Sequence, residues 1–132
     1  MLEVPDIFSL IQASVYFQDL PAPQQRVLAE SSHMTYYSAQ EIIFWEVDPV
    51  CSLFMIVSGK VKVYKQSSEG KEIILHLFSS GESFAEFPFF MQLPHYPACA
   101  MALQDTRLLV VDGYTFGGIA LNSAEVLRKI VA

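Results

Sequence analysis

The sequence predicts a mainly β domain with helices at both ends, of the sandwich, jelly-roll or barrel type. Between residues 33 and 112 it holds short β-prone runs that are separated by turn signals about every eight to twelve residues. Helical periodicity occurs only before and after these runs. The chain has 132 residues, which is enough for one domain with a single hydrophobic core.

Two short helices are predicted ahead of the strands. From Pro5 to about Phe17, apolar residues recur at three- and four-residue steps, which indicates an amphipathic helix. These residues are Ile7, Leu10, Ile11 and Val15. The stretch DLPAPQQRVLAESS then predicts a turn and a second helix, whose start is set by Pro21 and Pro23.

The β-prone runs are HMTYY, EIIF, SLFMIVSG, KVKVYKQ, EIILHLF, YPACAMAL and TRLLVVD. In KVKVYK, Val61 and Val63 alternate with lysines, which predicts a half-buried strand with its lysines in solvent. The segment SSEGK joins this strand to the next run and predicts a hairpin in which Gly70 has a positive φ angle.

The last twenty residues, GYTFGGIALNSAEVLRKIVA, predict a short helix and then a second helix capped by Asn122 or Ser123, with Glu125 near its first turn. An apolar stripe follows on the second helix. It consists of Val126, Leu127, Ile130 and Val131. Because this helix begins so late, we expect the chain to stop within a longer helix.

Composition and charge exclude several classes. A net charge of −6 argues against this chain being a nucleic-acid-binding surface by itself. The N-terminus shows no secretion signal, and the longest uncharged run, from Phe87 to Gln104, holds three prolines and cannot form a membrane helix. Cys51 and Cys99 are predicted to be free buried thiols in a reducing cytoplasm. The hydrophobic content of 52% has two explanations: a partner covers part of the surface, or the core is rich in aromatic residues.

The order of helices, β-roll and late helix, together with local motifs, resembles the sensor domain of the Crp/Fnr transcription regulators. YFQDLPAPQQRVLAE is similar to the entry helices of that family. LFMIVSGKVKVYKQSSEGKEIILHLFSSGESFAE resembles its hairpin and the start of its cyclic-nucleotide cassette. The resemblance covers nearly the whole chain. It implies a double-stranded β-helix, that is, a jelly-roll-like β-roll of the cyclic-nucleotide-binding type.

In the nucleotide-binding members of this family, the cassette has a glycine that admits the ligand, an acid for the ribose and an arginine for the phosphate. Here Phe84 and Glu86 stand at the aromatic and acidic positions, and Ala85 replaces the glycine. The arginine position falls at Tyr96 or, with a shift of one residue, at His95. Since Pro97 has no N–H either, we expect the pocket not to bind cAMP tightly. The ligand-binding residues implied by the resemblance are Phe84, Ala85, Glu86, Phe87, His95, Tyr96, Pro97 and Ala98.

The FAE and P-x-Y-x-A-x-A elements resemble a branch of the family that responds to diatomic gases or redox state, in some members through haem. In this interpretation, aromatic and methionine side chains would form an apolar pocket; the alternative is that they are ordinary core residues. They are Phe84, Phe87, Phe89, Phe90, Met91 and Tyr96. An axial haem ligand would have to be His33, His76, His95 or a methionine. His76 is predicted to be an ordinary strand residue, His33 an exposed one, and His95 the metal-ligand candidate nearest the cassette.

An enzyme is not expected. GESFA lacks the last glycine of a G-x-S-x-G nucleophile elbow, and the three histidines include no H-x-H pair of the kind found in metal-binding jelly-roll enzymes. We therefore expect the effector-sensing domain of a cytoplasmic Crp/Fnr-type regulator, with residues 1–121 as the sensor and residues 122–132 as the start of a dimerisation helix. The resemblance implies a homodimer, a small-molecule or gas effector, and DNA binding only through a C-terminal domain that this chain lacks. The bound cofactor stays open between haem and a cyclic nucleotide. The alternative function is a cyclic-nucleotide-binding regulatory module with a non-standard phosphate site.

Overall fold

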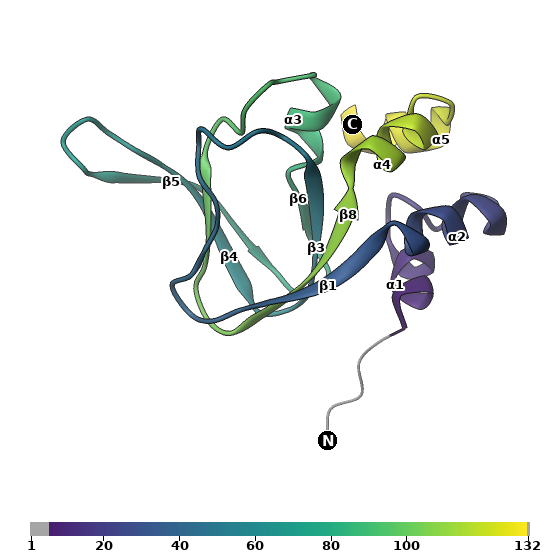
Figure 1. Ribbon diagram of the computed structural model, residues 1–132, viewed down its shortest axis with the longest axis horizontal. Coiled ribbons are helices and arrows are strands. Elements are labelled where there is room, and N and C mark those ends of the chain that lie inside the picture. Colours follow the sequence, from purple (N-terminus) through teal and green to yellow (C-terminus); the bar gives the residue numbers. More distant parts are fainter. Residues whose placement is uncertain (1–5, 132) are drawn as a thin grey trace.

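The computed structural model describes residues 6–131, except the side chains of residues 90, 130 and 131, and shows a β-roll with helices along one side (Figure 1). The strands are β1 (Ser32–Tyr37), β2 (Ile42–Phe44), β3 (Ser52–Ser58), β4 (Lys60–Gln66), β5 (Glu72–Ser79), β6 (Ser83–Phe84), β7 (Cys99–Ala102) and β8 (Thr106–Asp112). The helices are α1 (Ile7–Ala13), α2 (Ala22–Glu30), α3 (Glu86–Phe90), α4 (Gly113–Ala120) and α5 (Ala124–Val131).

The strands form two antiparallel four-stranded sheets, in the orders β1-β8-β3-β6 and β2-β7-β4-β5. The predicted mainly β fold with flanking helices is therefore confirmed. The inner faces of the two sheets enclose one hydrophobic cluster, which is the interior of the roll. Its buried members are Phe44, Phe54, Ile56, Val61, Phe84, Tyr96, Ala100, Leu108 and Val110.

A second hydrophobic cluster lies between the outer face of the first sheet and the helices. In β3, Leu53 and Met55 face the helices, whereas Phe54 and Ile56 face the interior of the roll. In β8 successive residues alternate in the same way between the two clusters. Because these two strands are covered on both faces, LFMI and LLVV are continuous apolar runs without the alternation of a half-exposed strand.

The first helix is shorter than predicted. Asp6 caps α1 by accepting a hydrogen bond from the Phe8 N–H at 3.4 Å, and the helix ends at Ala13, where Ser14 turns the backbone to an extended conformation. Pro5 lies outside the described residues. Phe17 is completely buried in the connection to α2 and meets the Phe116 ring at a centroid distance of 5.6 Å. Phe17 therefore belongs to the core without belonging to the helix, whereas Val15 of the predicted apolar stripe is 63% exposed.

The β4–β5 hairpin has the predicted turn, with Gly70 at φ 82°. The alternation predicted for β4 holds for Val61 and Val63, which face the interior of the roll. The opposite face is not simply in solvent, because Tyr64 is only 1% exposed there. The bulge in this hairpin lies in β5, where Leu75 has no partner in β4. Lys62 is also not a solvent-facing lysine. Its side chain is only 13% exposed, forms an ion pair of 2.6 Å with Glu72, and lies 4.8 Å from the centroid of the Tyr64 ring.

Strand β5 is an edge strand with apolar side chains in solvent, and its hairpin projects from the body of the roll (Figure 1). Over half of the surface of each of these side chains is exposed: Ile73, Ile74, Leu75 and Leu77. The high hydrophobic content thus comes from an aromatic core and from an exposed apolar strand; that a partner covers this strand stays a prediction. Cys51 is exposed, contrary to the prediction, and Cys99 is buried.

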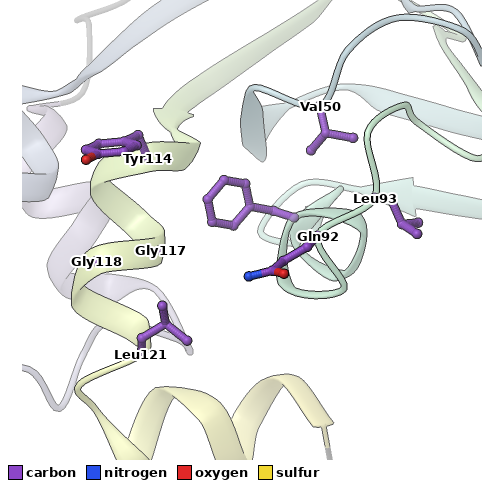
Figure 2. A pocket seen from close by; sticks show the side chains of 8 residues that line it. Val50, Gln92, Leu93, Tyr114, Gly117, Gly118 and Leu121 are labelled. Carbon is purple, nitrogen blue, oxygen red and sulfur yellow. The ribbon is translucent and has the colours of Figure 1, made fainter.

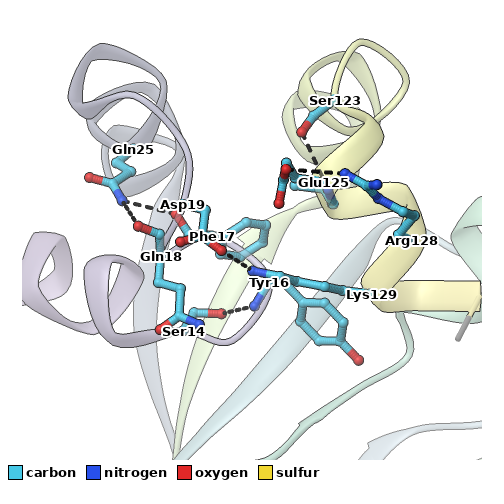
Figure 3. A network of polar contacts seen from close by, with 11 residues as sticks. Ser14, Tyr16, Phe17, Gln18, Asp19, Gln25, Ser123, Glu125, Arg128 and Lys129 are labelled. Atoms are coloured by element: carbon cyan, nitrogen blue, oxygen red, sulfur yellow. Dashed lines mark hydrogen bonds and ion pairs between the residues drawn. The ribbon is translucent and has the colours of Figure 1, made fainter.

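Ser123, not Asn122, caps the last helix, because its hydroxyl accepts a hydrogen bond from the Val126 N–H at 3.3 Å (Figure 3). Val126 is buried in the outer cluster, whereas the side chains of the predicted stripe at 130 and 131 lie outside the described part. An ion pair of 2.8 Å joins Lys129 to Asp19 and holds α5 against the connection between α1 and α2 (Figure 3). None of the helices within residues 6–131 has the length and apolar character needed to cross a membrane.

Candidate functional site

The cassette predicted from the sequence forms one continuous unit: β6, the short helix α3 and the loop that leads to β7. Ala85 sits between β6 and α3 in the left-handed conformation, with φ 71°. Glycine adopts this conformation without strain, whereas the alanine methyl group adds a steric cost. The backbone thus keeps the geometry of a glycine position, while the Ala85 side chain lines the cavity beneath it.

This cavity lies inside the roll and has a volume of about 190 Å³. Five of the residues predicted to bind ligand line it: Phe84, Ala85, Tyr96, Pro97 and Ala98. Five others were not predicted: Phe44, Val63, His76, Phe78 and Pro88. Most of these come from strands distant in the sequence, and only their inward orientation could have indicated them. Small-molecule pockets usually measure about 300–1,000 Å³, so this cavity admits only a small ligand unless it expands.

Tyr96 stands at the position where the resemblance places a phosphate-binding arginine. It is only 3% exposed, and its ring stacks on Phe44 with centroids 3.8 Å apart and planes at 14°. Its hydroxyl donates to the Ser52 carbonyl at 2.9 Å and accepts from the Ser52 N–H at 3.2 Å. Burial raises the pKa of Tyr96, so the hydroxyl stays neutral. A neutral side chain that is already hydrogen-bonded thus occupies the place of a cation.

Further aromatic rings fill the interior around Tyr96. Phe84 stacks on Phe54 with centroids 5.0 Å apart and on Phe78 at 5.6 Å. Phe78 in turn contacts the His76 ring at 4.1 Å. His76, predicted to be an ordinary strand residue, therefore stands at the exposed rim of the cavity. No arginine or lysine is among the lining residues.

Glu86 is turned away from the cavity. Its Oε1 atom accepts a hydrogen bond from the Tyr16 hydroxyl at 3.1 Å, while its Oε2 atom is buried without a partner. Burial, the Glu86 charge and this hydrogen bond together raise the pKa of Tyr16 to about 12. The acid that would hold a ribose in the related nucleotide sites thus joins α3 to the N-terminal helices.

The remaining predicted site residues lie outside the cavity. Phe87 is 56% exposed, and His95 is exposed and pairs through its backbone with Pro49. The predicted apolar pocket therefore retains only Phe84 and Tyr96; Met91 is 57% exposed, and the Phe90 side chain lies outside the described part. Whether any of the eight predicted residues binds an effector stays a prediction.

Phe89 packs on the backbone of α4. A Cβ atom on Gly113 would lie 2.8 Å from the Phe89 ring, and one on Gly117 would overlap it. The ring also meets Phe116 with centroids 6.0 Å apart. Two glycines four residues apart thus form the surface that receives this ring. Beside it lies a groove of about 480 Å³ between α3 and α4, whose rim includes Gln92, Tyr114 and Leu121 (Figure 2).

Neither cavity suits haem. The interior cavity is smaller than the pockets of ordinary drug-sized ligands, and a porphyrin is larger than these. The groove between α3 and α4 is lined by no histidine, cysteine or methionine, and Tyr114, its one side chain of a type that ligates haem iron, is 88% exposed. Among residues 6–131, no three His, Cys, Asp or Glu side chains are grouped so that they could hold a metal ion.

The fold and the cassette define a domain of the cyclic-nucleotide-binding type. Residues 34–123 match the family model described as "Cyclic nucleotide-binding domain", and the chain belongs to this family. It is 31% identical over 106 residues to the CRP-like protein Clp of Xanthomonas campestris pv. campestris (strain B100), an alignment that covers 80% of this chain and 41% of Clp. The chain thus spans less than half the length of this relative.

Solved structures agree with this assignment. The sensor domain of the transcriptional regulator DNR from Pseudomonas aeruginosa has a TM-score of 0.86 and 25% identity, over 93% of this chain and 82% of that one. The predicted resemblance to a Crp/Fnr sensor domain is therefore confirmed. The catabolite activator protein of Thermus thermophilus (TM-score 0.73, 24% identity, 89% of this chain and 55% of that one) shares the fold. So does the cAMP-bound regulatory domain of Toxoplasma gondii PKA (TM-score 0.75, 18% identity, 86% and 43%).

Replacing Tyr96 with phenylalanine should lower the free energy of unfolding by about 1–3 kcal/mol, because the Ser52 backbone loses its partner in a partly buried place. Urea unfolding measures the change. Tyr36→Phe is the matched control, since Tyr36 is 59% exposed and should change stability little. Equal effects of the two substitutions would show that the Tyr96 hydroxyl does not hold the cavity closed.

The free energy of unfolding should also fall between pH 10 and about pH 12, because Tyr16 titrates differently in the folded and unfolded states. Since the pKa of Tyr16 in the folded state, about 12, is above its ordinary value of 10.0, the folded protein retains a proton that the unfolded chain releases. This contribution is complete below pH 10 and is lost as the pH rises towards 12. Tyr16→Phe should make the fall less steep in unfolding experiments across this range. Tyr114→Phe, at an 88% exposed position, should leave the slope unchanged; an unchanged slope in Tyr16→Phe would contradict the assignment.

Proposed function

We propose that this chain is the effector-sensing domain of a bacterial Crp/Fnr-type transcription regulator that acts in the cytoplasm. Residues 1–121 form the sensor, and residues 122–132 begin a dimerisation helix. Membership of the cyclic nucleotide-binding domain family supports this, as do the similarities to Clp and to the DNR sensor domain. In this proposal the regulator is a homodimer, and DNA is bound by a further domain outside the 132 residues. The sensor itself catalyses no reaction.

The effector of this domain is a small molecule without a phosphate. The observation that carries this is Tyr96, which fills the phosphate position with a neutral, fully engaged side chain. The walls around it are almost entirely apolar, and the volume of about 190 Å³ suits a ligand of few atoms. His76 is the one titratable side chain besides Tyr96 in the lining, and it provides a polar contact at the rim.

One observation favours the second candidate, a cyclic-nucleotide module with a non-standard phosphate site. The Oε2 atom of Glu86 is buried and has no hydrogen-bond partner, and a ribose hydroxyl would supply one. For this to happen, Glu86 would have to turn from Tyr16 into the roll, and Tyr96 would have to leave its stack on Phe44. The nucleotide phosphate would still meet no arginine. Arg107 lies in a different pocket, and Arg128 pairs with Glu125.

The effector signal passes from the cassette to the helices through two contacts of α3. Phe89 presses on the glycine surface of α4, and Glu86 is hydrogen-bonded to Tyr16. Helix α4 leads directly to α5, which is held to the N-terminal helices by the Lys129–Asp19 ion pair. A ligand that moves α3 would therefore alter the position of α5, where the dimerisation helix begins.

Titration calorimetry with cAMP tests the choice between the two candidates. The missing arginine fork and N–H remove charge-assisted hydrogen bonds of about 1.5–3 kcal/mol each, which weakens binding on the order of a hundredfold. We expect no dissociation constant in the micromolar range or below. If cAMP does bind at micromolar concentration and Glu86→Gln weakens it, the second candidate replaces the first.

Alanine at Phe89 tests the coupling route in the intact regulator. Loss of the ring removes the contact with α4, so the effector-dependent change in transcription should diminish or become constitutive. Phe87→Ala is the matched control, because Phe87 lies on the same helix but is 56% exposed. A reporter gene measures both, and thermal unfolding verifies that the variants fold. An unaltered effector response in a folded Phe89→Ala regulator would refute this route.

A further inference from the structure

A second pocket lies at the end of the β-roll away from the helices. Strand β1 pairs with β8 so that Ser32, next to α2, faces Val111, and Tyr37 faces Thr106 at the other end. The pocket opens at that other end and has a volume of about 380 Å³. We call it the Arg107 pocket; its other lining residues are Tyr36, Tyr37, Ser38, Ser58, Asp105 and Thr106. It shares no lining residue with the cavity of the cassette.

The side chain of Arg107 has no hydrogen-bond or ion-pair partner among the described residues. Its Nε atom is buried and makes no hydrogen bond, and no carboxylate among residues 6–131 lies within 4.0 Å of its guanidinium group. The guanidinium carbon lies over the Tyr36 ring, 5.2 Å from its centroid. A buried donor of a charged group is normally satisfied, so this one indicates an acceptor that comes from outside the chain.

The polar groups around Arg107 determine which acceptor fits. Asp105 accepts a hydrogen bond from the Ala39 N–H at 3.1 Å, and nearby Glu41 accepts one from the Ser38 N–H at 2.8 Å. These two carboxylates are held by backbone donors and not by Arg107, but their charges oppose a multiply charged anion. A group with a single negative charge and two oxygens matches the planar fork of arginine.

We propose that the Arg107 pocket binds the carboxylate of a small molecule, with Arg107 as the anchor and the rings of Tyr36 and Tyr37 beside the body of the ligand. The ligand's two oxygens accept from the Arg107 guanidinium once its buried Nε atom turns towards the pocket, and Ser38 and Ser58 stand in the same wall. This site is independent of the effector cavity. It gives the domain a second place for a metabolite, at the start of the strand whose other end leads into α4.

Benzoate, benzamide and inorganic phosphate are suitable probes on the full 132-residue chain, with the ionic strength kept constant by sodium chloride. We expect benzoate to move the Arg107 Nε–Hε signal in ¹⁵N-correlated NMR spectra and to raise Tm in a saturable way. Benzamide has the same shape without the charge and should do neither. Arg107→Met should weaken benzoate binding at least about tenfold, because the charge-assisted pair is lost. Arg128→Met, at a side chain that is 72% exposed, should change it less than about twofold.

Each other outcome overturns the proposal. A benzoate response that survives in Arg107→Met places binding elsewhere, for instance in the apolar cavity of the cassette. An equal response to benzamide shows that the charge is not recognised, and tighter binding of phosphate than of benzoate refutes the carboxylate assignment. If Arg128→Met weakens benzoate binding as much as Arg107→Met does, the effect of either substitution is a general change in charge and not the loss of a specific site. If Arg107→Met does not fold, the Arg107 Nε–Hε signal of the unaltered protein decides alone: a shift with benzoate and not with benzamide supports the site, and no shift refutes it.

Discussion

The packing of Tyr96 inside the β-roll is the constraint on which the site depends. Its ring stacks on Phe44, and its hydroxyl reaches the backbone of Ser52 in the opposite sheet, so that one side chain joins both sheets across the interior. An arginine could not take this role, because a guanidinium group needs an anion or water and would be costly among apolar walls. At the position where the resemblance implies a phosphate-binding arginine, Tyr96 therefore stabilises a small apolar cavity instead.

Helix α3, which links this cavity to the helices in the proposed coupling, is held on two sides. Glu86 in its first turn is hydrogen-bonded to Tyr16, and Phe89 near its end lies on the two glycines of α4. Both partners belong to the layer of helices that covers the outer face of the β1-β8-β3-β6 sheet. If α3 moves, α4 has to move or repack with it, because the Phe89 ring lies directly on the backbone of α4 and no space is left between them. The contact between cassette and helices is thus a close fit of ring against backbone.

The two ends of the roll have different chemical character. The cassette end is apolar and lined by aromatic rings, whereas the far end exposes a guanidinium, hydroxyls and carboxylates. Strand β8 passes between them and is buried on both faces along most of its length. The third distinctive surface is on the edge strand β5, where Ile73, Ile74, Leu75 and Leu77 are each more than half exposed. A domain of this size therefore presents three separate surfaces on one rigid roll.

The sequence alone determined the fold class, the hairpin turn at Gly70 and most element boundaries, because periodicity, turn chemistry and motif spacing are local properties. Tertiary structure alone decided where the side chains point. Glu86 turned to Tyr16, His76 came to the cavity rim, Phe87 went to solvent, and Tyr64 was buried beside Lys62 on the outer face of β4. It also brought Phe44 and Phe78 to the cavity and left Arg107 unpaired. These outcomes depend on contacts between strands that are far apart in the chain, and a linear pattern carries no information about which distant side chain offers the better partner.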